Sequence, residues 1–487
     1  MNQSTFLTIG AAGGTPVVQL ARMSNRHGLI AGATGTGKTI TLQVLAEAFS
    51  RLGVPVFAAD IKGDLSGLGA AGQPHRKIEE RLSKIPLEDF RQRPYPVIFW
   101  DIFGTNGHPI RATVTEMGPL LLSNLLELND TQSGVLYGAF KLADDQGLLL
   151  LDLKDLRALL AWMADSRQIL GSDYGHFSAA SIGAIQRQLL ILEQQGAEHF
   201  FGEPVVQLAD LMQVDFSGNG VISLFDATRL VRQSPRVYAS FMLWLLSELF
   251  EQLPEVGDPE KPRLVFFFDE AHLLFDGAPK PLIDKIGQVA RLIRSKGVGI
   301  YFITQSPLDI PDEILGQLGL KIQHALRAFT PKDRKVIQSV SQSFRSNPEL
   351  DTQTVLTELG IGEALVSTLD DKGSPAPVAR TLIRPPESRI GPIGDDERKE
   401  RIARSPMAGR YNQLVDRESA YEILKQRAAE QSASTPVSSS NPTPGRGAGR
   451  GRQSPAEAMI KSAARSIGSQ LGRQLIRGIM GSLFRNK

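Results

Sequence analysis

The sequence of 487 residues contains no cysteine. This excludes disulfide bonds, thiolate metal sites and cysteine nucleophiles, and it fits a reducing compartment. No apolar stretch approaches the ~20 residues that a membrane-spanning helix needs. The first residues do not combine a basic region with an apolar run, as a signal peptide does. We therefore expect a cytoplasmic protein without a transmembrane segment.

The sequence also lacks an excess of charge of one sign. Its formal net charge is +2, with 54 Lys and Arg against 52 Asp and Glu. Bulk charge therefore gives no indication of nucleic acid binding, which only local clusters of charge can decide. Apolar residues make up 41% and charged residues 22% of the chain, as in soluble globular proteins. The length predicts one large or two modest domains with appended segments.

A glycine-rich stretch at residues 32–39 fits the pattern G-x-x-x-x-G-K-[ST] at every fixed position. A short apolar strand (28–31) precedes it, and a helical pattern of apolar residues follows it up to Gly53. A glycine-rich turn could match by chance, but both flanks favour a phosphate-binding loop. The loop residues are Gly32, Ala33, Thr34, Gly35, Thr36, Gly37, Lys38 and Thr39.

Each part of this loop suits a nucleoside triphosphate. Glycine lets the backbone approach closely, so that successive N–H groups and the helix N-terminus can face phosphate oxygens. Lys38 can reach the β- and γ-phosphates, and the Thr39 hydroxyl can bind Mg²⁺. ATP and Mg²⁺ are therefore the expected cofactors.

An apolar strand (264–268) ends in two acidic residues, Asp269 and Glu270. We expect Asp269 to help hold Mg²⁺ and Glu270 to polarise the attacking water. One hydroxyl, one carboxylate and the phosphate oxygens are enough, because Mg²⁺ takes few direct protein ligands. The alternative is a strand that merely ends in acidic residues at the surface. The phosphate-binding loop upstream favours the catalytic interpretation.

A polar residue, Gln305, ends the next apolar strand (300–305). Its amide is expected beside the two carboxylates, where it could sense the γ-phosphate. The alternative is a turn residue before Ser306 and Pro307. His272 follows the carboxylates closely, but no second histidine lies at metal-binding spacing, so we expect it to support the site or to lie in the core.

Three arginines are candidates for stabilising the charge of the transition state. Arg26 precedes the first core strand, Arg294 ends the helix before the Gln305 strand, and Arg327 ends the strand that follows. A fixed guanidinium can contact γ-phosphate oxygens, often from a neighbouring subunit. The alternative for each is a solvated surface charge, and Arg294 is the strongest candidate.

Strands separated by helices predict an α/β fold with a mostly parallel, doubly wound sheet. Helical periodicity dominates the middle of the chain, and a segment rich in Ser, Pro and Gly separates a basic, amphipathic C-terminus from the rest. The expected parts are a short N-terminal β segment (1–22), a P-loop ATPase core (23–74 and 218–385), a helix-rich insertion (75–217), a charged helical arm (386–430), a disordered linker (431–455) and a basic amphipathic tail helix (456–487).

These motifs together resemble those of the HerA/FtsK superfamily of hexameric DNA-pumping ATPases. The chain is most similar to a bacterial HerA-like branch, the helicase HerA-like C-terminal proteins, and the resemblance covers nearly its whole length. The segments that carry it are Arg26-His27-Gly28, the loop 32–39, Asp60-Ile61-Lys62-Gly63-Asp64, Asp269-Glu270-Ala271-His272, 294–300, Thr304-Gln305-Ser306-Pro307, 416–422 and 477–483.

The resemblance implies a RecA-like core of the additional-strand P-loop type, ATP hydrolysis, a homo-oligomer of hexameric form, and DNA as a possible substrate. One feature departs from the family pattern. HerA-type translocases carry a sizeable β-barrel before the phosphate-binding loop, whereas about 30 residues precede it here. Partner docking by that barrel is therefore not carried over, and the helix-rich insertion is expected to serve a different partner.

Two functions remain open from the sequence. One is a ring-forming DNA translocase or helicase, and the other is an ATP-driven conformational switch that acts on a protein partner through the insertion or the tail, without nucleic acid. A small-molecule kinase shares the loop, but Glu270 beside Asp269 suits water activation and no lid segment is evident. The sequence shows no aromatic-rich basic groove that would separate the first two. A basic amphipathic tail suits a membrane surface, nucleic acid or a neighbouring subunit.

Overall fold

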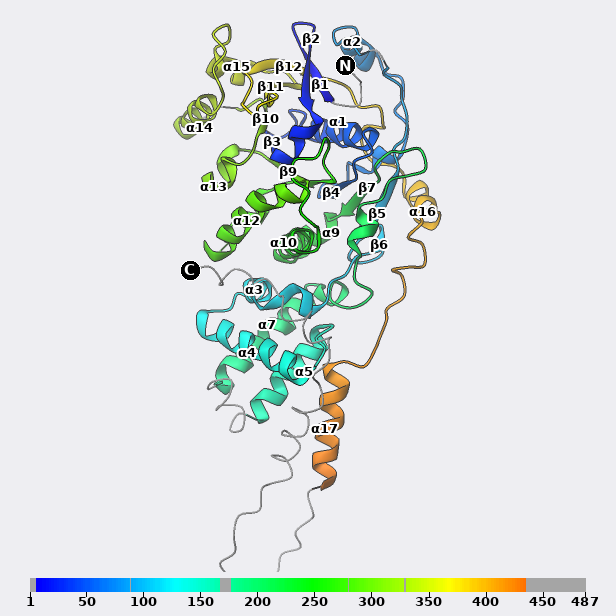
Figure 1. Ribbon diagram of the computed structural model, residues 1–487, viewed down its shortest axis with the longest axis vertical. Helices are drawn as coiled ribbons and strands as arrows, with labels where there is room; N and C mark the ends of the chain where they lie inside the picture. The colour runs from blue at the N-terminus through cyan, green and yellow to red at the C-terminus, as the bar shows by residue number, and fades with distance from the viewer. Residues whose placement is uncertain (1–5, 88, 167–176, 279, 328–329, 435–487) are drawn as a thin grey trace, which may run out of the picture. The chain divides into compact units, whose positions relative to one another are not determined.

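The computed structural model describes residues 6–87, 89–166, 177–278, 280–327 and 330–434. The expected tail helix and all but the first residues of the expected linker lie outside these ranges. Within them, no helix is long and apolar enough to cross a membrane. The chain forms two compact units (Figure 1), the first made of residues 1–112 and 195–415 and the second of 113–194 with the segment that begins at 416.

The first unit is built on one sheet of twelve strands. Their order is β2-β1-β12-β11-β10-β3-β9-β8-β4-β7-β5-β6. The strands are β1 (Phe6–Ala12), β2 (Thr15–Leu20), β3 (Gly28–Ala31), β4 (Val56–Asp60), β5 (Val97–Asp101), β6 (His108–Pro109), β7 (Ile222–Asp226), β8 (Leu264–Phe268), β9 (Val298–Thr304), β10 (Leu320–His324), β11 (Glu363–Ser367) and β12 (Ala379–Ile383).

The eight strands from β10 to β6 are parallel to one another, and the four from β11 to β2 add antiparallel pairs at one side. Most parallel strands are connected through helices, as right-handed crossovers require. The expected α/β class with a mostly parallel sheet is thus confirmed. The sheet also places the carboxyl ends of β3, β9, β8, β4 and β7 along one edge, where ligands of such sheets bind.

Helices cover both faces of the sheet. On one face, α1 (Lys38–Arg51) packs its apolar side, including Leu42 and Phe49, against the central strands. The ring of Phe49 contacts those of Phe267 and Tyr301, with centroids 6.4 and 5.6 Å apart. Burial of such aromatic side chains is a main source of core stability. The helix that begins at the phosphate-binding loop is therefore fixed to the sheet.

On the other face, α10 (Pro235–Gln252) packs against β7. The ring of Phe241 on α10 lies 4.7 Å from that of Phe225 on β7. The buried residues of α10 lie on nearly all sides of the helix, as expected for a helix in the core. The remaining helices of this unit are α2 (Arg76–Leu82), α8 (Leu208–Leu211), α9 (Thr228–Gln233), α11 (His272–Phe275), α12 (Lys280–Leu292), α13 (Asp312–Leu315), α14 (Pro331–Gln342), α15 (Thr352–Glu358) and α16 (Asp395–Ala403), with short 3₁₀ turns at 21–26, 66–69, 197–199, 293–296 and 307–309.

The second unit is a group of helices, as periodicity predicted for the middle of the chain. They are α3 (Val114–Leu125), α4 (Asp130–Gln146), α5 (Leu153–Asp165), α7 (Ala179–Gln194) and α17 (Ala420–Ser434). Side chains of Thr113, Asn129 and Asp152 cap the first three of them in capping boxes, which satisfy backbone N–H groups at a helix start.

The boundaries of the units differ from the expected insertion of 75–217. The strands β5 and β6 extend the core sheet beside β7, so residues 75–112 and 195–217 belong to the first unit. The expected arm of 386–430 is also not one element. Its helix α16 belongs to the first unit and α17 to the second, and 404–419 between them is not helical. Tertiary pairing, which periodicity does not report, decides both boundaries.

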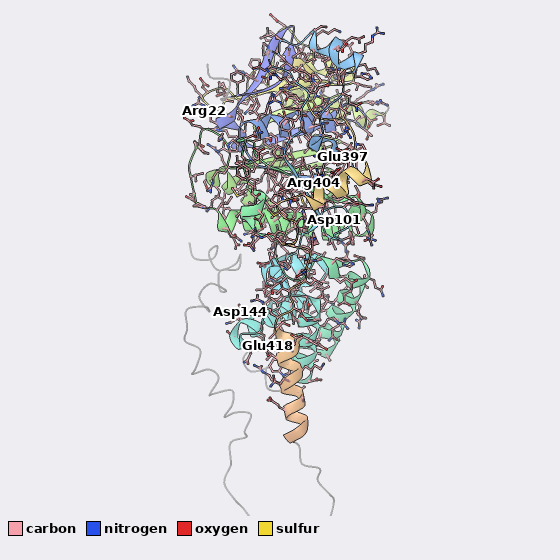
Figure 2. All side chains as sticks on the ribbon, turned by 90° about the vertical axis from the view of Figure 1, so that its right-hand side faces the viewer. Arg22, Asp101, Asp144, Glu397, Arg404 and Glu418 are labelled. Atoms are coloured by element: carbon pink, nitrogen blue, oxygen red, sulfur yellow. The ribbon has the colours of Figure 1, made fainter. Side chains whose placement is uncertain are left out.

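Charged side chains attach the segment after β12 to the first unit. Glu387 is buried and accepts from Arg51, Arg93 and Arg384. Farther along, Glu397 on α16, which is labelled in Figure 2, pairs with Arg401, one turn later. A buried carboxylate is stable only when it is paired in this way, so the segment is part of the core rather than an appended arm.

Candidate active site

The phosphate-binding loop joins β3 to α1 at the carboxyl edge of the sheet. All three of its glycines have a positive φ that side chains disfavour, 150° at Gly32, 78° at Gly35 and 115° at Gly37. A Cβ at Gly32 would lie 2.5 Å from the Cβ of His324. Glycine is therefore required for the path of the loop as well as for close approach to a ligand.

The loop also carries the two side chains expected to contact phosphate and metal. Lys38 is buried, and its Nζ donates to the carbonyl oxygens of Gly32 (2.6 Å) and Ala33 (3.2 Å). Burial, with the nearby charge of Lys62, lowers the pKa of Lys38. Burial raises the pKa of the Asp64 carboxyl group, and the nearby Thr39 side chain acts against this rise. The loop after β4 thus reaches the first turn of α1.

His324, at the end of β10, links the loop to its surroundings. Thr41 on α1 lies 2.8 Å from Nε2 of His324, and the backbone oxygen of Glu363 lies 3.0 Å from Nδ1. This arrangement suits a neutral ring whose Nδ1–H donates to Glu363 while Nε2 accepts from Thr41. Burial lowers the pKa of His324 to about 4, which keeps the ring neutral.

The acidic pair follows β8, two strands away from β3 in the sheet. The backbone N–H of Ala271 donates to Ile303 on β9 at 2.8 Å, and the Tyr238 hydroxyl of α10 donates to the backbone oxygen of Asp269 at 3.2 Å. Glu270 has a φ of 46°, a conformation uncommon outside glycine that often marks functional sites. Both carboxyl groups are buried.

Lys62, in the loop after β4, binds the carboxylate of Glu270. Its Nζ lies 2.8 Å from Oε1 of Glu270, and Nδ1 of His272 lies 3.5 Å from Oε2. Burial raises the pKa of Glu270, but the hydrogen bond and charge of Lys62 outweigh it, so that the pKa is below its usual value. Among the described side chains, Oε2 has no hydrogen-bond partner. Glu270 is therefore an ionised carboxylate with one buried oxygen that can still accept a hydrogen bond.

Two aspartates, Asp60 and Asp269, lie near the ion pair of Lys62 and Glu270. Burial, and then the charge of Asp64, raise the pKa of Asp60 to about 7. Burial raises that of Asp269 to about 7 as well, against the charge of Lys62. Asp60 accepts from the backbone N–H groups of Gly63, Asp64 and Leu65. It therefore fixes the turn that carries Lys62.

Another acidic residue, Asp226, ends β7 beside β4. It pairs at 2.6 Å with Arg398 of α16, whose guanidinium also lies over the ring of Phe99, 5.1 Å from its centroid. Both partners of the ion pair are almost fully buried. Asp226 is therefore neutralised by its own arginine, which leaves Lys62 to the carboxylates at β4 and β8.

Gln305 follows β9, and its side chain is exposed. It borders a cavity of about 710 Å³ that His272 also lines. Its neighbours are fixed, since Asp309 accepts from the Thr304 hydroxyl (2.5 Å) and from the backbone of Ser306 (3.0 Å). The strand thus brings Gln305 to the same edge as the acidic pair, while contact of its amide with a γ-phosphate stays a prediction.

The three candidate arginines lie at different edges of the sheet. Arg327 is exposed beyond the end of β10, at the same edge of the sheet as the phosphate-binding loop. Arg26 precedes the start of β3, and Arg294 precedes the start of β9. Because the strands are parallel, Arg26 and Arg294 lie at the opposite edge from the loop of the same chain.

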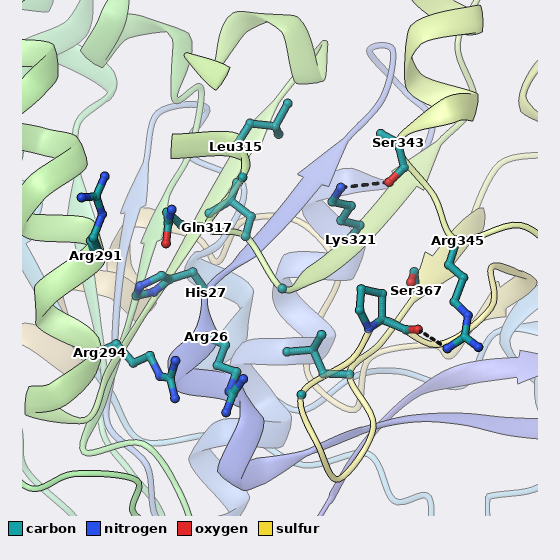
Figure 3. A pocket seen from close by; sticks show the side chains of 16 residues that line it. Arg26, His27, Arg291, Arg294, Leu315, Gln317, Lys321, Ser343, Arg345 and Ser367 are labelled. Carbon is teal, nitrogen blue, oxygen red and sulfur yellow. Dashed lines mark hydrogen bonds between the residues drawn. The ribbon is translucent and has the colours of Figure 1, made fainter. Parts of the chain in front are cut away.

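Arg26 and Arg294 line a basic cavity of about 410 Å³. Figure 3 shows their guanidinium groups pointing to the same side. Arg294 donates to Asp258 at 3.1 Å, and this hydrogen bond, with the weaker effect of Arg26, lowers the pKa of Asp258. None of the sixteen residues that line the cavity is acidic, and three more are cationic: Arg291, Lys321 and Arg345.

Sequence reasoning did not assign roles to several residues that the structure places at the site. Lys62 and Asp64 carried a signal, because their segment leaves the sheet at the carboxyl end of a buried strand. His324 and Arg398 carried none. Each reaches the site through a strand order or a helix position that only the fold defines.

Part of the chain is similar in sequence to known proteins. A probable helicase of Methanocaldococcus jannaschii is 33% identical over 125 residues, which are 25% of this chain and 22% of that protein. The DNA double-strand break repair helicase HerA of Pyrococcus furiosus is 26% identical over 123 residues, 25% of this chain and 20% of the relative. The matches thus span about a fifth of each of these curated relatives.

Two solved structures share the fold over most of the chain. VirB4 of Thermoanaerobacter pseudethanolicus matches with a TM-score of 0.52 and 17% identity, covering 79% of this chain and 97% of that one. The bacterial conjugative coupling protein TrwB matches with a TM-score of 0.50 and 16% identity, covering 79% and 91%. The family described as Helicase HerA-like C-terminal matches residues 7–487. The chain therefore belongs to the Helicase HerA-like C-terminal family.

Proposed function

We propose that the protein is an ATP hydrolase, a P-loop motor of the HerA/FtsK type that assembles as a ring and moves DNA. The observation that carries this proposal is the convergence of Lys38, Thr39, Asp269 and Glu270 at one edge of the sheet. Family membership and the relatives named as helicases support it. A cytoplasmic location fits the cysteine-free sequence.

The residues present fit MgATP. The glycines of the loop allow its backbone to approach phosphate closely, and the buried Oε2 of Glu270 lacks a hydrogen-bond partner among the described side chains. Thr39 and Asp269 would hold Mg²⁺ together with phosphate oxygens. Bound Mg²⁺ would neutralise charge that develops on the β- and γ-phosphates. The related TrwB has been solved with a GTP analogue.

Each protein group has a distinct part in hydrolysis. Lys38 would exchange its bonds to Gly32 and Ala33 for phosphate oxygens, as an ammonium group with three donors can. Glu270, held ionised by Lys62, would accept a hydrogen bond from the attacking water through its open oxygen and orient it. Gln305 is expected near the γ-phosphate from the same chain, while Arg327, beyond the end of β10, is available to the nucleotide at the same edge of the sheet.

The position of the other two arginines supports a ring. Arg26 and Arg294 lie at the edge opposite to the phosphate-binding loop of their own chain. We therefore assign them to the nucleotide of a neighbouring copy, where a fixed guanidinium stabilises transition-state charge. The basic cavity without acidic lining residues supports this assignment. A closed ring, a hexamer by family resemblance, would give every site such a neighbour.

The decisive experiment measures ATP turnover of the full chain with and without double-stranded DNA. A DNA motor should hydrolyse ATP faster when DNA is present, and the Glu270→Gln variant should show no turnover under either condition. Turnover that ignores DNA of every tested form would remove the DNA assignment and leave the ATPase.

That outcome would favour the second candidate, an ATP-driven switch that acts on a protein. One observation supports it: α7 in the second unit exposes two adjacent apolar side chains, Leu190 (45%) and Ile191 (48%). Apolar side chains grouped on a surface favour contact with another protein. Substituting both with Ser should then abolish partner binding without changing basal turnover.

A further inference from the structure

An apolar side chain is exposed beside the phosphate-binding loop. Ile361, between α15 and β11, is 78% exposed. The next residue, Gly362, donates its backbone N–H to the backbone oxygen of Thr36 at 2.9 Å. A Cβ at Gly37 would lie 3.3 Å from the Cα of Gly362. The turn that carries Ile361 is therefore in direct contact with the loop that would hold the phosphates.

This turn is rigidly held. Arg81 on α2 donates to the backbone oxygens of Ile361 (3.1 Å) and Gly362 (2.8 Å). Gly362 has a φ of 75°, and a Cβ there would lie 2.5 Å from the Arg81 guanidinium. The carboxylate of Glu363 accepts from the N–H of Gly360 at 3.0 Å. The hydrogen bonds of this turn hold the apolar side chain of Ile361 in an exposed position. Such a fixed, exposed side chain suits contact with a ligand.

The order of strands defines which part of a nucleotide reaches this turn. β3, which carries the loop, lies between β9 and β10. The catalytic carboxylates follow β8, on the β9 side, so the γ-phosphate belongs on that side. β11 begins beside the end of β10 at the same edge, where Ala364 pairs with His324. The end of the nucleotide that is farthest from the γ-phosphate therefore points toward Ile361.

We propose that Ile361 is the platform on which the nucleobase of the bound nucleotide lies, with Arg81 as the positioning residue of that platform. This inference rests on the proposed function, because it requires a nucleotide in the phosphate-binding loop. A planar base has an apolar face, and contact with an aliphatic side chain removes both surfaces from water. Such a contact involves only the face of the base and not the hydrogen-bonding groups at its edge. Adenine and guanine should therefore bind equally well.

The test compares ligands with and without a base. Dissociation constants of ATP, GTP and inorganic tripolyphosphate, each with Mg²⁺, are measured by calorimetry for the full chain and for Ile361→Ala. We expect affinity for ATP and GTP to fall by about five- to tenfold, as loss of roughly 1 kcal/mol of apolar contact implies. Affinity for tripolyphosphate should not change. Arg81→Met should show the same pattern.

Two controls isolate the effect. Leu414→Ala removes a similarly exposed aliphatic side chain (70%) on a segment whose next residue bonds to Glu203, and it should bind all three ligands as the wild type does. Lys38→Ala should weaken all three. Thermal unfolding of Ile361→Ala should match the wild type, because the side chain buries little surface.

Three results would overturn the inference while leaving the proposed function intact. In the first, Ile361→Ala binds ATP as tightly as the wild type. In the second, it loses tripolyphosphate to the same extent as ATP, so that it acts on the loop itself. In the third, the wild type binds ATP no more tightly than tripolyphosphate. A wild-type chain that binds none of the three would overturn the proposed function and this inference together.

Discussion

The ammonium group of Lys62 lies 2.8 Å from Oε1 of Glu270. The two residues come from loops that follow neighbouring strands, β4 and β8. Lys62 is the cation that keeps Glu270 ionised among buried carboxyl groups, since its hydrogen bond and charge outweigh the effect of burial on the pKa. It also leaves the second oxygen of Glu270 available. This pair connects the phosphate-binding loop, through Asp64 and Thr39, to the group that would act on water.

The first prediction separates nucleotide binding from hydrolysis. Glu270→Gln preserves shape but removes the charge that orients water, so kcat should fall by at least about 100-fold while ATP affinity is retained. Lys38→Ala should instead lower the affinity itself. Fluorescent-nucleotide titration and steady-state turnover measure the two effects. A normal rate in purified Glu270→Gln protein would refute the role of this residue.

The second prediction concerns Lys62. Lys62→Met should lower kcat by roughly ten- to 100-fold, because a misplaced catalytic group loses about that much, with little change in KM. Lys62→Arg should restore part of the rate. In a double-mutant cycle, adding Lys62→Met to Glu270→Gln should cost nothing more. Multiplied losses would mean that Lys62 acts directly on the phosphates.

The third prediction tests whether arginines act between subunits. Arg294→Ala and Glu270→Gln proteins should each be inactive, and mixing them should restore activity, because some sites then combine an intact arginine with an intact glutamate. Subunit exchange is monitored with labelled chains. Rings that exchange subunits without any recovery would refute the assignment of Arg294 to the nucleotide of a neighbouring copy. The same mixture with Arg26→Ala tests the second arginine.

The fourth prediction is a loss of stability in acid that depends on His27. Nε2 of His27 lies 2.6 Å from the backbone oxygen of Ala290, and Nδ1 accepts from Ile300 at 3.0 Å. Burial lowers its pKa to about 4 from the ordinary 6.5. The unfolded chain therefore takes up the proton first as the pH falls, and this contribution to stability is complete above pH 6.5 and is lost toward pH 4.

At pH 5 this loss amounts to about 2 kcal/mol for His27. The thermal midpoint of the first unit should fall between pH 7.5 and 5, and it should fall less in His27→Asn. The backbone of this position, with φ of 61° and ψ of 173°, strains any side chain, so the strain is common to the two proteins and the comparison isolates the imidazole. An equal fall in both proteins would show that His27 does not cause the acid sensitivity.

The fifth prediction concerns the basic segment beyond the described residues. A chain that ends at Ser434 retains α17, whose Tyr421 backbone N–H donates to Asp155 on α5 at 2.9 Å, and it should bind nucleotide normally. Its oligomer distribution, DNA binding or lipid binding should change, because the amphipathic helix expected for 456–487 would carry an apolar stripe that needs a covering surface. Light scattering, DNA titration and vesicle sedimentation measure these properties. A truncated protein that matched the full chain in all three would leave the stripe without a role.

Local pattern predicted much of this protein because the interactions involved are local. The loop 32–39 needs only glycine, lysine and threonine at fixed spacing, and the strand before Asp269 needs only an apolar run. The middle helices follow from their periodicity and caps. These features, with the α/β class and the membership of the HerA-like group, were all expected from the sequence.

Tertiary structure decided what depends on strand order. Sequence places Lys62 and Glu270 more than 200 residues apart, and only the pairing of β4 with β8 brings them into contact. The same holds for Ile361 beside the phosphate-binding loop and for Arg26 and Arg294 at the opposite edge. The pairing of β5 with β7 is likewise the reason why the boundary of the helical unit differs from the predicted one. Strand pairing joins distant segments through backbone hydrogen bonds and burial. The pattern of apolar residues in one strand does not show which other strand it pairs with.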